Sequence, residues 1–224
     1  MKDNRSVRVF SEGVPAVETK QEAAIRNAVG GENDSRAREF ARYMKEVGER
    51  YVDQLDVKLI YRRDRYLRGG DHTSFSQEGF PAVRVTEMNE NFNHQHQDLR
   101  TENGIVYGDL PEFADYNYIQ KVCRMNLSVL ANIAKAPAEP QNVGIVTSDL
   151  TNNTTLKWDA PKSTKPAGYY ILMRETTSPY WERKTFVTET QVTVPYSKDN
   201  YFFAVQSVDA EGHESAIVFP KPVR

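Results

Sequence analysis

The sequence predicts two domains of different class, an α/β domain over residues 1–136 and an all-β sandwich over residues 137–224. In the first part, helical apolar patterns alternate with short strand-like runs, which is typical of an α/β layer structure. In the second part, short β runs recur with turn residues between them, which is typical of a sandwich. Between the two lies the segment Lys135-Ala-Pro-Ala-Glu-Pro140, whose prolines end a helix and stiffen a linker.

The elements expected in the first part alternate between strands and helices. Strands are predicted at 7–10, 57–61 and 82–85, and helices at 21–29, along the apolar stripe from Ala37 to Tyr51, and at 118–135. Asp34 or Ser35 can cap the second helix. Helical spacing gives that helix the apolar stripe Ala37, Phe40, Ala41, Met44, Val47 and Tyr51. It gives the last helix the inner face Ile119, Val122, Cys123, Leu127, Leu130 and Ile133. A two-faced sheet usually has more than three strands, so this half is expected to be part of a domain.

Seven strands are expected in the second part, at 143–146, 155–158, 169–174, 184–188, 191–194, 201–208 and 215–219. Trp158 stands before Asp159-Ala-Pro161, and the runs Gly168–Arg174 and Tyr201–Ser215 follow. Together these residues resemble a fibronectin type III module, an immunoglobulin-like sandwich. The resemblance implies that Trp158 and Tyr201 fill its core.

Composition excludes several classes of function. The net charge of −2 gives no electrostatic reason to expect nucleic acid or an anionic membrane as a partner. No apolar run approaches the roughly 20 residues of a membrane span, and the start of the chain shows no signal peptide. The single Cys123 excludes an internal disulfide and a cysteine-based zinc site, and its apolar helical setting predicts a buried, inert thiol.

Two polar segments lie between Arg68 and Asp98, on either side of the strand predicted at 82–85. The first is Arg68-Gly-Gly-Asp-His-Thr-Ser-Phe75, in which the glycines allow a tight turn. By themselves, Asp71 and His72 fit either a capped, solvated loop or a site at a strand end. In the last segment, Asn91-Phe-Asn-His-Gln-His-Gln-Asp98, imidazoles stand near a carboxylate, as at zinc sites, although two surface histidines would look the same.

These segments, joined by Gly79-Phe-Pro-Ala-Val-Arg-Val-Thr-Glu87, resemble the last third of the bacterial zinc aminopeptidases, the metallopeptidase family that also includes the glutaminyl cyclases. The resemblance implies that His96 is a zinc ligand, with His94 as the alternative. It implies that Asp71, His72 and Asp98 lie near the substrate or orient the metal ligands. It further implies two zinc ions, a peptide substrate and a periplasmic or secreted enzyme.

Most of that family's metal ligands are missing from this sequence. The family supplies, in order, a His-x-Asp, a bridging Asp, a Glu-Glu pair, an Asp and the closing His. Here no Glu-Glu pair exists, and the only His-x-Asp is His96-Gln-Asp98 in the closing position. We therefore expect this chain to be the C-terminal portion of a longer enzyme, and we expect the portion to start just after the missing ligands. One imidazole cannot hold zinc alone, so the chain by itself is expected to be inactive.

Other interpretations remain open from the sequence. The chain could be a non-catalytic interaction or scaffold protein, or the intact protein could carry out glutaminyl-cyclase acyl transfer. A half-sheet would expose an edge and an apolar face, which predicts self-association. The run Tyr61-Arg-Arg-Asp-Arg-Tyr66 invites a phosphate-site reading, but it is expected to be a strand end with a solvated loop.

Overall fold

The computed structural model describes residues 3–148 and 150–224. Two compact units make up the chain, Met1–Val129 and Leu130–Arg224, and each is described by itself. The division falls within α4 (Tyr116–Lys135), which is a single continuous helix. The domain boundary expected at residues 136 and 137 stays a prediction.

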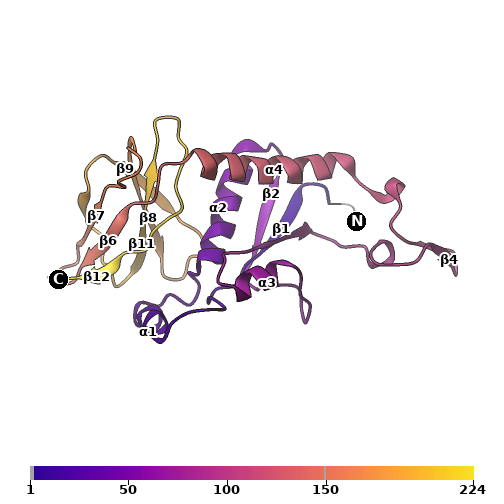
Figure 1. The fold of residues 1–224 in the computed structure, drawn as a ribbon, viewed down its shortest axis with the longest axis horizontal. Coiled ribbons are helices and arrows are strands. Elements are labelled where there is room, and N and C mark those ends of the chain that lie inside the picture. The colour runs from indigo at the N-terminus through magenta and orange to yellow at the C-terminus, as the bar shows by residue number, and fades with distance from the viewer. Residues whose placement is uncertain (1–2, 149) are drawn as a thin grey trace. The chain divides into compact units, whose positions relative to one another are not determined.

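A three-stranded mixed sheet forms the centre of the first unit (Figure 1). The strand β1 (Ser6–Phe10) lies in the middle, parallel to β2 (Asp56–Ile60) and antiparallel to β3 (Arg84–Glu87). The mixed sheet and its three strands confirm the predicted class. Both β2 and β3 are edge strands of this sheet.

The helices expected in this unit are present, and one more is added. They are α1 (Lys20–Val29), α2 (Arg36–Tyr51), the unexpected α3 (His72–Gln77) and α4. Thr19 and Glu22 cap α1 reciprocally, and the Ser35 side chain caps α2. The short elements after β3 are η1 (Phe92–His94), β4 (Arg100–Glu102), β5 (Ile105–Tyr107) and η2 (Pro111–Phe113).

The apolar core of the first unit lies between the sheet and the helices α2 and α4. Its buried members are Val7, Val9, Ala41, Tyr43, Met44, Val47, Val52, Leu55, Val57, Met125 and Val129. Gly48 allows α2 to approach α4 closely, because a Cβ there would lie 2.7 Å from Cγ of Met125. At the other end of the helix pair, the Tyr118 hydroxyl donates to the Ser6 carbonyl (2.8 Å), and burial raises the pKa of Tyr118 to about 12.

The predicted inner face of α4 is wrong. Of the six residues expected there, only Val122 packs against the core, whereas Ile119, Leu127, Leu130 and Ile133 are exposed. Cys123, expected to be buried, is exposed as well. The buried apolar residues are Met125 and Val129, on the opposite side of the helix, and Asn132 is buried with them. Both sides of α4 are apolar, so the periodicity of the sequence alone could not choose between them.

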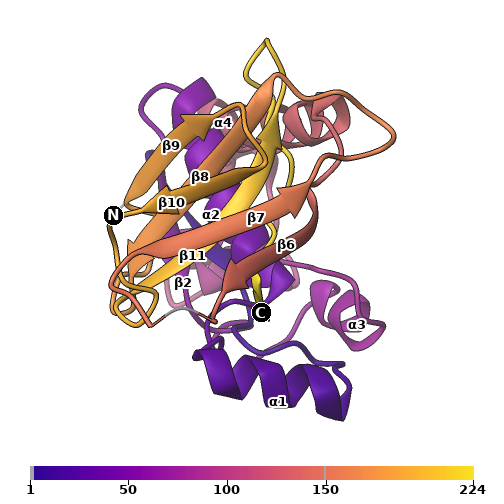
Figure 2. The same cartoon turned by 90° about the vertical axis from the view of Figure 1, so that its left-hand side faces the viewer.

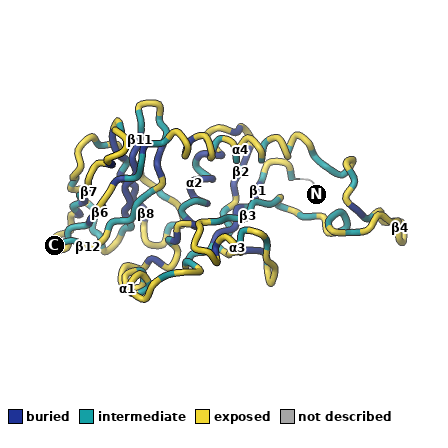
Figure 3. Tube along the Cα trace, in the orientation of Figure 1, coloured by how far each residue is buried: buried dark blue, intermediate teal, exposed yellow. Residues whose placement is uncertain are grey.

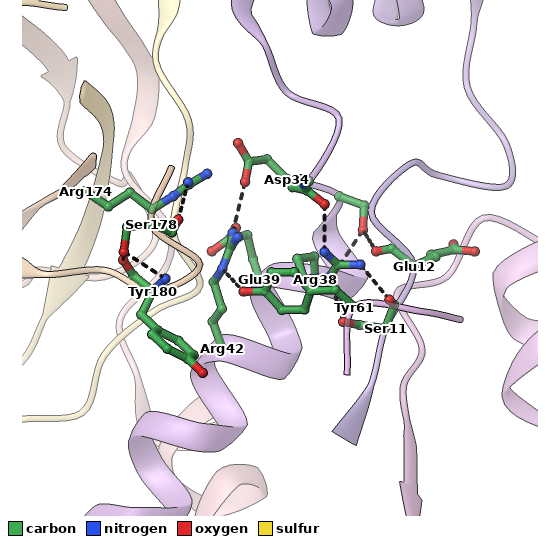
Figure 4. Close-up of polar contacts among 12 residues, drawn as sticks. Ser11, Glu12, Asp34, Arg38, Glu39, Arg42, Tyr61, Arg174, Ser178 and Tyr180 are labelled. Carbon is green, nitrogen blue, oxygen red and sulfur yellow. Dashed lines mark hydrogen bonds and ion pairs between the residues drawn. The ribbon is translucent and has the colours of Figure 1, made fainter. Parts of the chain in front are cut away.

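Two buried arginines of α2 hold the polar side of this unit together (Figure 4). The guanidinium of Arg38 donates to Ser11 Oγ (2.8 Å), to the Ser11 carbonyl (2.7 Å) and to Asn33 Oδ1 (3.0 Å). It also lies 3.7 Å from the centre of the Tyr61 ring. Arg42 pairs with Asp34 at 3.0 Å and donates to the Tyr61 hydroxyl. The ends of β1 and β2 are thereby fastened to α2.

The second unit is a sandwich of two sheets (Figure 2). One sheet has the order β10-β7-β6-β12 and the other the order β11-β8-β9. The strands are β6 (Gln141–Val146), β7 (Thr154–Asp159), β8 (Gly168–Glu175), β9 (Arg183–Val187), β10 (Gln191–Val194), β11 (Tyr201–Val208) and β12 (Lys221–Val223). The strand predicted at 215–219 is wrong: within that range only Val218 forms an isolated bridge, to Val205, and the last strand comes later and pairs in parallel with β6.

Aromatic residues fill and flank the core of this sandwich. Trp158 is buried and meets Tyr169 edge to face, and Tyr201 packs against the same cluster, as expected. The buried guanidinium of Arg174 lies over the rings of Phe202 and Trp181 and donates to the Ser178 carbonyl at 2.8 Å (Figure 4). The rest of the core consists of Val143, Leu156, Ile171, Met173, Phe203 and Val205.

We expect Arg38→Ala to lower the free energy of unfolding of the first unit by about 3 kcal/mol, because it leaves buried acceptors unpaired. Circular dichroism at 222 nm during urea unfolding reports this unit, which holds α1, α2 and α3. Fluorescence of Trp158 and Trp181 reports the second unit separately, and its midpoint should not move.

The matched control is Arg36→Ala, at an exposed position on the same helix, which should change the unfolding free energy by no more than about 0.5 kcal/mol. Equal decreases in the unfolding free energy for the two variants would show that the buried guanidinium stabilises the first unit no more than an exposed arginine does.

Candidate functional site

The two predicted site segments begin at opposite ends of the sheet. Phe10 pairs with both Ile60 and Arg84, so the segment with Asp71 and His72 leaves β2 at the carboxyl end of β1. Val7 pairs with Glu87, so β3 runs back and ends at the amino end of β1. The segment with His94 and His96 starts there and leads toward β4 (Figure 1). Because β3 is antiparallel, the carboxyl ends of the three strands do not share one edge.

A buried carboxylate, Asp64, organises the first segment. Its Oδ1 accepts hydrogen bonds from the Arg65 backbone N–H (2.6 Å) and from Arg65 Nε (3.2 Å). The guanidinium of Arg84 on β3 lies 3.6 Å from the same oxygen. His72 Nε2 lies 3.5 Å from the other oxygen and 2.9 Å from the Arg63 carbonyl. A carbonyl can only accept, so Nε2 carries a proton, and the ring is fixed between the two groups.

A second carboxylate extends this cluster to the central strand. Glu90 accepts from Arg65 Nη1 at 2.7 Å and from Arg8 Nη2 at 2.8 Å. Its side chain is 5% exposed and that of Asp64 is 3% exposed, so both ion pairs are shielded from water. The solvated loop expected at 61–66 is therefore wrong at Asp64. No feature of the run itself shows which of its charges is buried, because the partners His72, Arg84 and Glu90 come from later segments.

Burial by itself would raise the pKa of both carboxyls, but the cations around them have the larger effect. Hydrogen bonds from Arg65 and the charges of Arg84 and His72 leave the pKa of Asp64 below its usual range. Hydrogen bonds and charges from Arg8 and Arg65 do the same for Glu90. Glu87 behaves differently, because burial and the nearby charge of Glu90 raise its pKa. The cluster thus keeps two ionised acids beside one that binds a proton more readily.

Gly70 serves a purpose other than the expected tight turn. Its backbone lies outside the left-handed region, and a Cβ built on it would collide with Nη1 of Arg84. The glycine therefore makes room for the arginine that faces Asp64. Asp71, next in the chain, is exposed and precedes α3 without a side-chain bond to that helix. Asp71 and His72 remain predicted site residues, and the structure separates them into one solvent-facing side chain and one enclosed ring.

The two histidines of the second segment have different surroundings. His94 stacks on Phe113, with ring centres 3.6 Å apart and planes 5° from parallel. The Asn91 side-chain oxygen accepts from the Asn93 N–H (3.0 Å), which directs its amide nitrogen toward His94 Nδ1 at 3.1 Å. His94 Nδ1 then accepts, and Nε2 holds the proton. His96 is exposed, and its backbone has a φ of 51°, in the left-handed region.

The residues present do not fit a complete zinc centre. Within residues 3–148 and 150–224, no group of three or more His, Cys, Asp or Glu side chains could hold a metal ion. Zinc sites in proteins almost always use at least three protein ligands. His94 or His96 could thus contribute to a metal site only together with ligands from elsewhere. The same part of the chain contains no helix long and apolar enough to cross a membrane.

Comparison with known proteins points to metallopeptidases. The chain is 49% identical over 222 residues to a probable zinc metalloprotease of Leptosphaeria maculans, a match of 99% of this chain and 52% of that protein. It is 46% identical over 224 residues to one of Pyrenophora teres, covering 99% of this chain and 46% of the relative. A third, of Pyricularia oryzae, is 45% identical over 228 residues, and the match covers 99% of this chain and 45% of the relative. The chain spans about half the length of the curated relatives it matches. No family model matches it.

Among solved structures, the neighbours are fibronectin type III domains. One is a domain of human collagen alpha-1(XX), with a TM-score of 0.32 and 18% identity, covering 38% of this chain and 82% of that one. Another is an Fn3-like protein of Clostridium thermocellum, with a TM-score of 0.29 and 21% identity, covering 40% of this chain and 97% of that one. The sandwich of the second unit is established by its own strand pairing rather than by these scores.

The Asp64 cluster predicts a specific loss of stability in acid. Both lowered carboxyl pKa values mean that the unfolded state binds more protons, so the stabilisation is present above about pH 4.5 and is lost as the pH falls further. Asp64→Asn keeps the acceptor but removes the charge. It should cost the first unit about 2 kcal/mol at pH 7 and flatten the pH dependence of its urea midpoint between pH 5 and 3.

The control for this experiment is Asp53→Asn, at an exposed carboxylate that follows α2. This variant should keep the acid dependence of the unmodified chain. If the urea midpoint of Asp64→Asn fell with pH in parallel with that of the unmodified chain, the neighbours of Asp64 would not stabilise its ionised form.

Proposed function

We propose that this chain is one portion of a zinc-dependent peptidase, that it contributes His96 to the metal site, and that it is inactive alone. The observation that carries the proposal is the similarity at 49% identity across nearly the whole chain to a probable zinc metalloprotease about twice as long. The missing ligand group supports it, because the matched half of such an enzyme need not contain all ligands. The specific reaction that we propose is removal of amino-terminal residues from peptides by an exported enzyme.

His96 is favoured over His94 by the contacts around each ring. The proton on Nε2 of His94, set by Asn91, leaves no free lone pair on that nitrogen, and Nδ1 already accepts a bond. The side chain of His96 is exposed, and Asp98 lies two residues further along the same loop. A carboxylate at that position can accept the second N–H of a metal-bound imidazole and so orient the ring.

The first segment is proposed to serve the substrate rather than the metal. The exposed carboxylate of Asp71 can reach a ligand, whereas the enclosed ring of His72 fixes the segment through Asp64. Asp71 would then contact a part of the substrate away from the metal, because its segment leaves the sheet at the end opposite the start of the His96 segment, and His72 would act as a positioning residue. The sandwich is proposed to be a packing or attachment module. A non-catalytic interaction role is the second candidate, and the exposed apolar side of α4 is the observation that favours it.

The test uses a chimera of the Leptosphaeria maculans relative in which this chain replaces the matched region. The chimera should bind zinc, measured by mass spectrometry of the dialysed protein, and should hydrolyse aminoacyl-p-nitroanilides. The isolated chain should do neither. His96→Ala in the chimera should lower both the zinc content and kcat/KM, the latter by more than about 100-fold, since loss of even an orienting partner costs about 10–100-fold.

His94→Ala is the matched control and should retain zinc and activity to within about tenfold. Chelator-sensitive turnover by the isolated chain would overturn the proposed incompleteness. Full zinc content in the His96→Ala chimera would overturn the ligand assignment.

A further inference from the structure

The solvent-facing side of α4 carries an apolar stripe that the core of its own unit does not use. In the first unit the stripe consists of Tyr116, Ile119, Cys123 and Leu127, whose positions repeat at intervals of three and four residues. Tyr116 is 65% exposed, Ile119 46% and Leu127 67%, and Cys123 is exposed too. Exposed and intermediate stretches alternate along α4 in Figure 3. The same helix continues this pattern with the exposed residues Leu130 and Ile133. A stripe of this kind is the docking face of an amphipathic helix.

The charges of α4 restrict what can cover this stripe. The helix contains Lys121, Arg124 and Lys135 and no aspartate or glutamate. Lys121 donates to the carbonyls of Asn4 and Gln54, and Lys135 lies 3.8 Å from Glu211. Arg124 is therefore the exposed cation next to the stripe, and two copies joined stripe to stripe would bring the Arg124 side chains toward each other. Like charges placed across an interface oppose association. The helix composition thus favours an apolar partner surface flanked by acids over a second copy of the same helix.

The relatives indicate where such a partner would come from. Each of the three matched proteins carries about as much polypeptide outside the matched region as within it. The first unit also exposes Leu67, Phe75 and Phe80, so its apolar surface is not confined to α4. A three-stranded sheet with two open edges and this much exposed apolar side chain is what remains when a larger domain is divided.

We propose that the stripe of Tyr116, Ile119, Cys123 and Leu127 binds the part of the peptidase that this chain lacks, through an apolar surface flanked by carboxylates. The inference rests on the proposed function, since it identifies the partner as the remainder of the same metallopeptidase. Docking on α4 then completes the layer of the first unit. In this arrangement α4 is a shared internal helix, with Met125 and Val129 facing one side and the stripe facing the other.

The experiment co-expresses this chain, tagged, with the unmatched part of the Leptosphaeria maculans relative. The two should co-purify as a one-to-one complex in the presence of EDTA, measured by size-exclusion chromatography with light scattering. The double variant Ile119→Glu with Leu127→Glu should reduce the recovered partner at least about tenfold, because it places two charges in an apolar contact.

The control is Asn117→Glu, which adds a single glutamate at an exposed position outside the stripe on the same helix. It should bind like the unmodified chain, and both variants should keep its melting temperature. Absence of a complex, or equal binding by the double variant and the control, would overturn the inference. Self-association of the chain alone that is abolished by the double variant would also overturn it, in favour of a second copy. Because EDTA is present, complex formation is scored independently of zinc and peptidase activity.

Discussion

The polar side of the first unit depends on one buried cation, the guanidinium of Arg38. It meets the end of β1 through Ser11, the end of β2 through the Tyr61 ring, and the preceding loop through Asn33. Burial lowers the pKa of Arg38 to about 10, so the side chain remains charged at neutral pH at a real desolvation cost. That cost is offset only while every acceptor stays in place. One side chain thereby couples the ends of both parallel strands to α2.

The Asp64 cluster also depends on a buried charge, but here the central group is an anion surrounded by cations. There a buried carboxylate gathers Arg65, Arg84 and His72, and Glu90 connects the group to Arg8 on the central strand. Charges therefore fasten the strand ends in places where a larger domain would use apolar layers. The apolar core itself is confined to the space between the sheet and the helices α2 and α4. In this division, ion pairs connect the loops to the three-stranded sheet, and one side of α4 stays exposed.

The sequence predicted those parts of the fold whose signal is local. A cap at Asp34 or Ser35 before an amphipathic run identified α2, and the β-branched runs at 7–10 and 57–61 identified two strands. The face of α4 could not be predicted, because the choice between Met125 and Leu127 depends on what the helix packs against. The burial of Asp64 could not be predicted either, since its partners are distant in sequence. For the candidate site, Asp71 and His96 were chosen by motif, and their roles stay predictions. Only the structure revealed that β3 is antiparallel and separates their segments.

The proposed zinc site and the apolar stripe of α4 would be completed by the same partner. A zinc ion needs ligands that the described residues do not assemble, and the apolar stripe of α4 needs a covering surface. A partner that only covered the stripe would make this chain a binding module. A partner that only supplied metal ligands would leave Leu127 exposed to water. A single polypeptide of the size that the relatives carry outside the matched region could supply both. One partner is the simpler solution, because a metal centre requires ligands held rigidly by packed elements, and covering the stripe would add a packed layer to the core that the first unit already has.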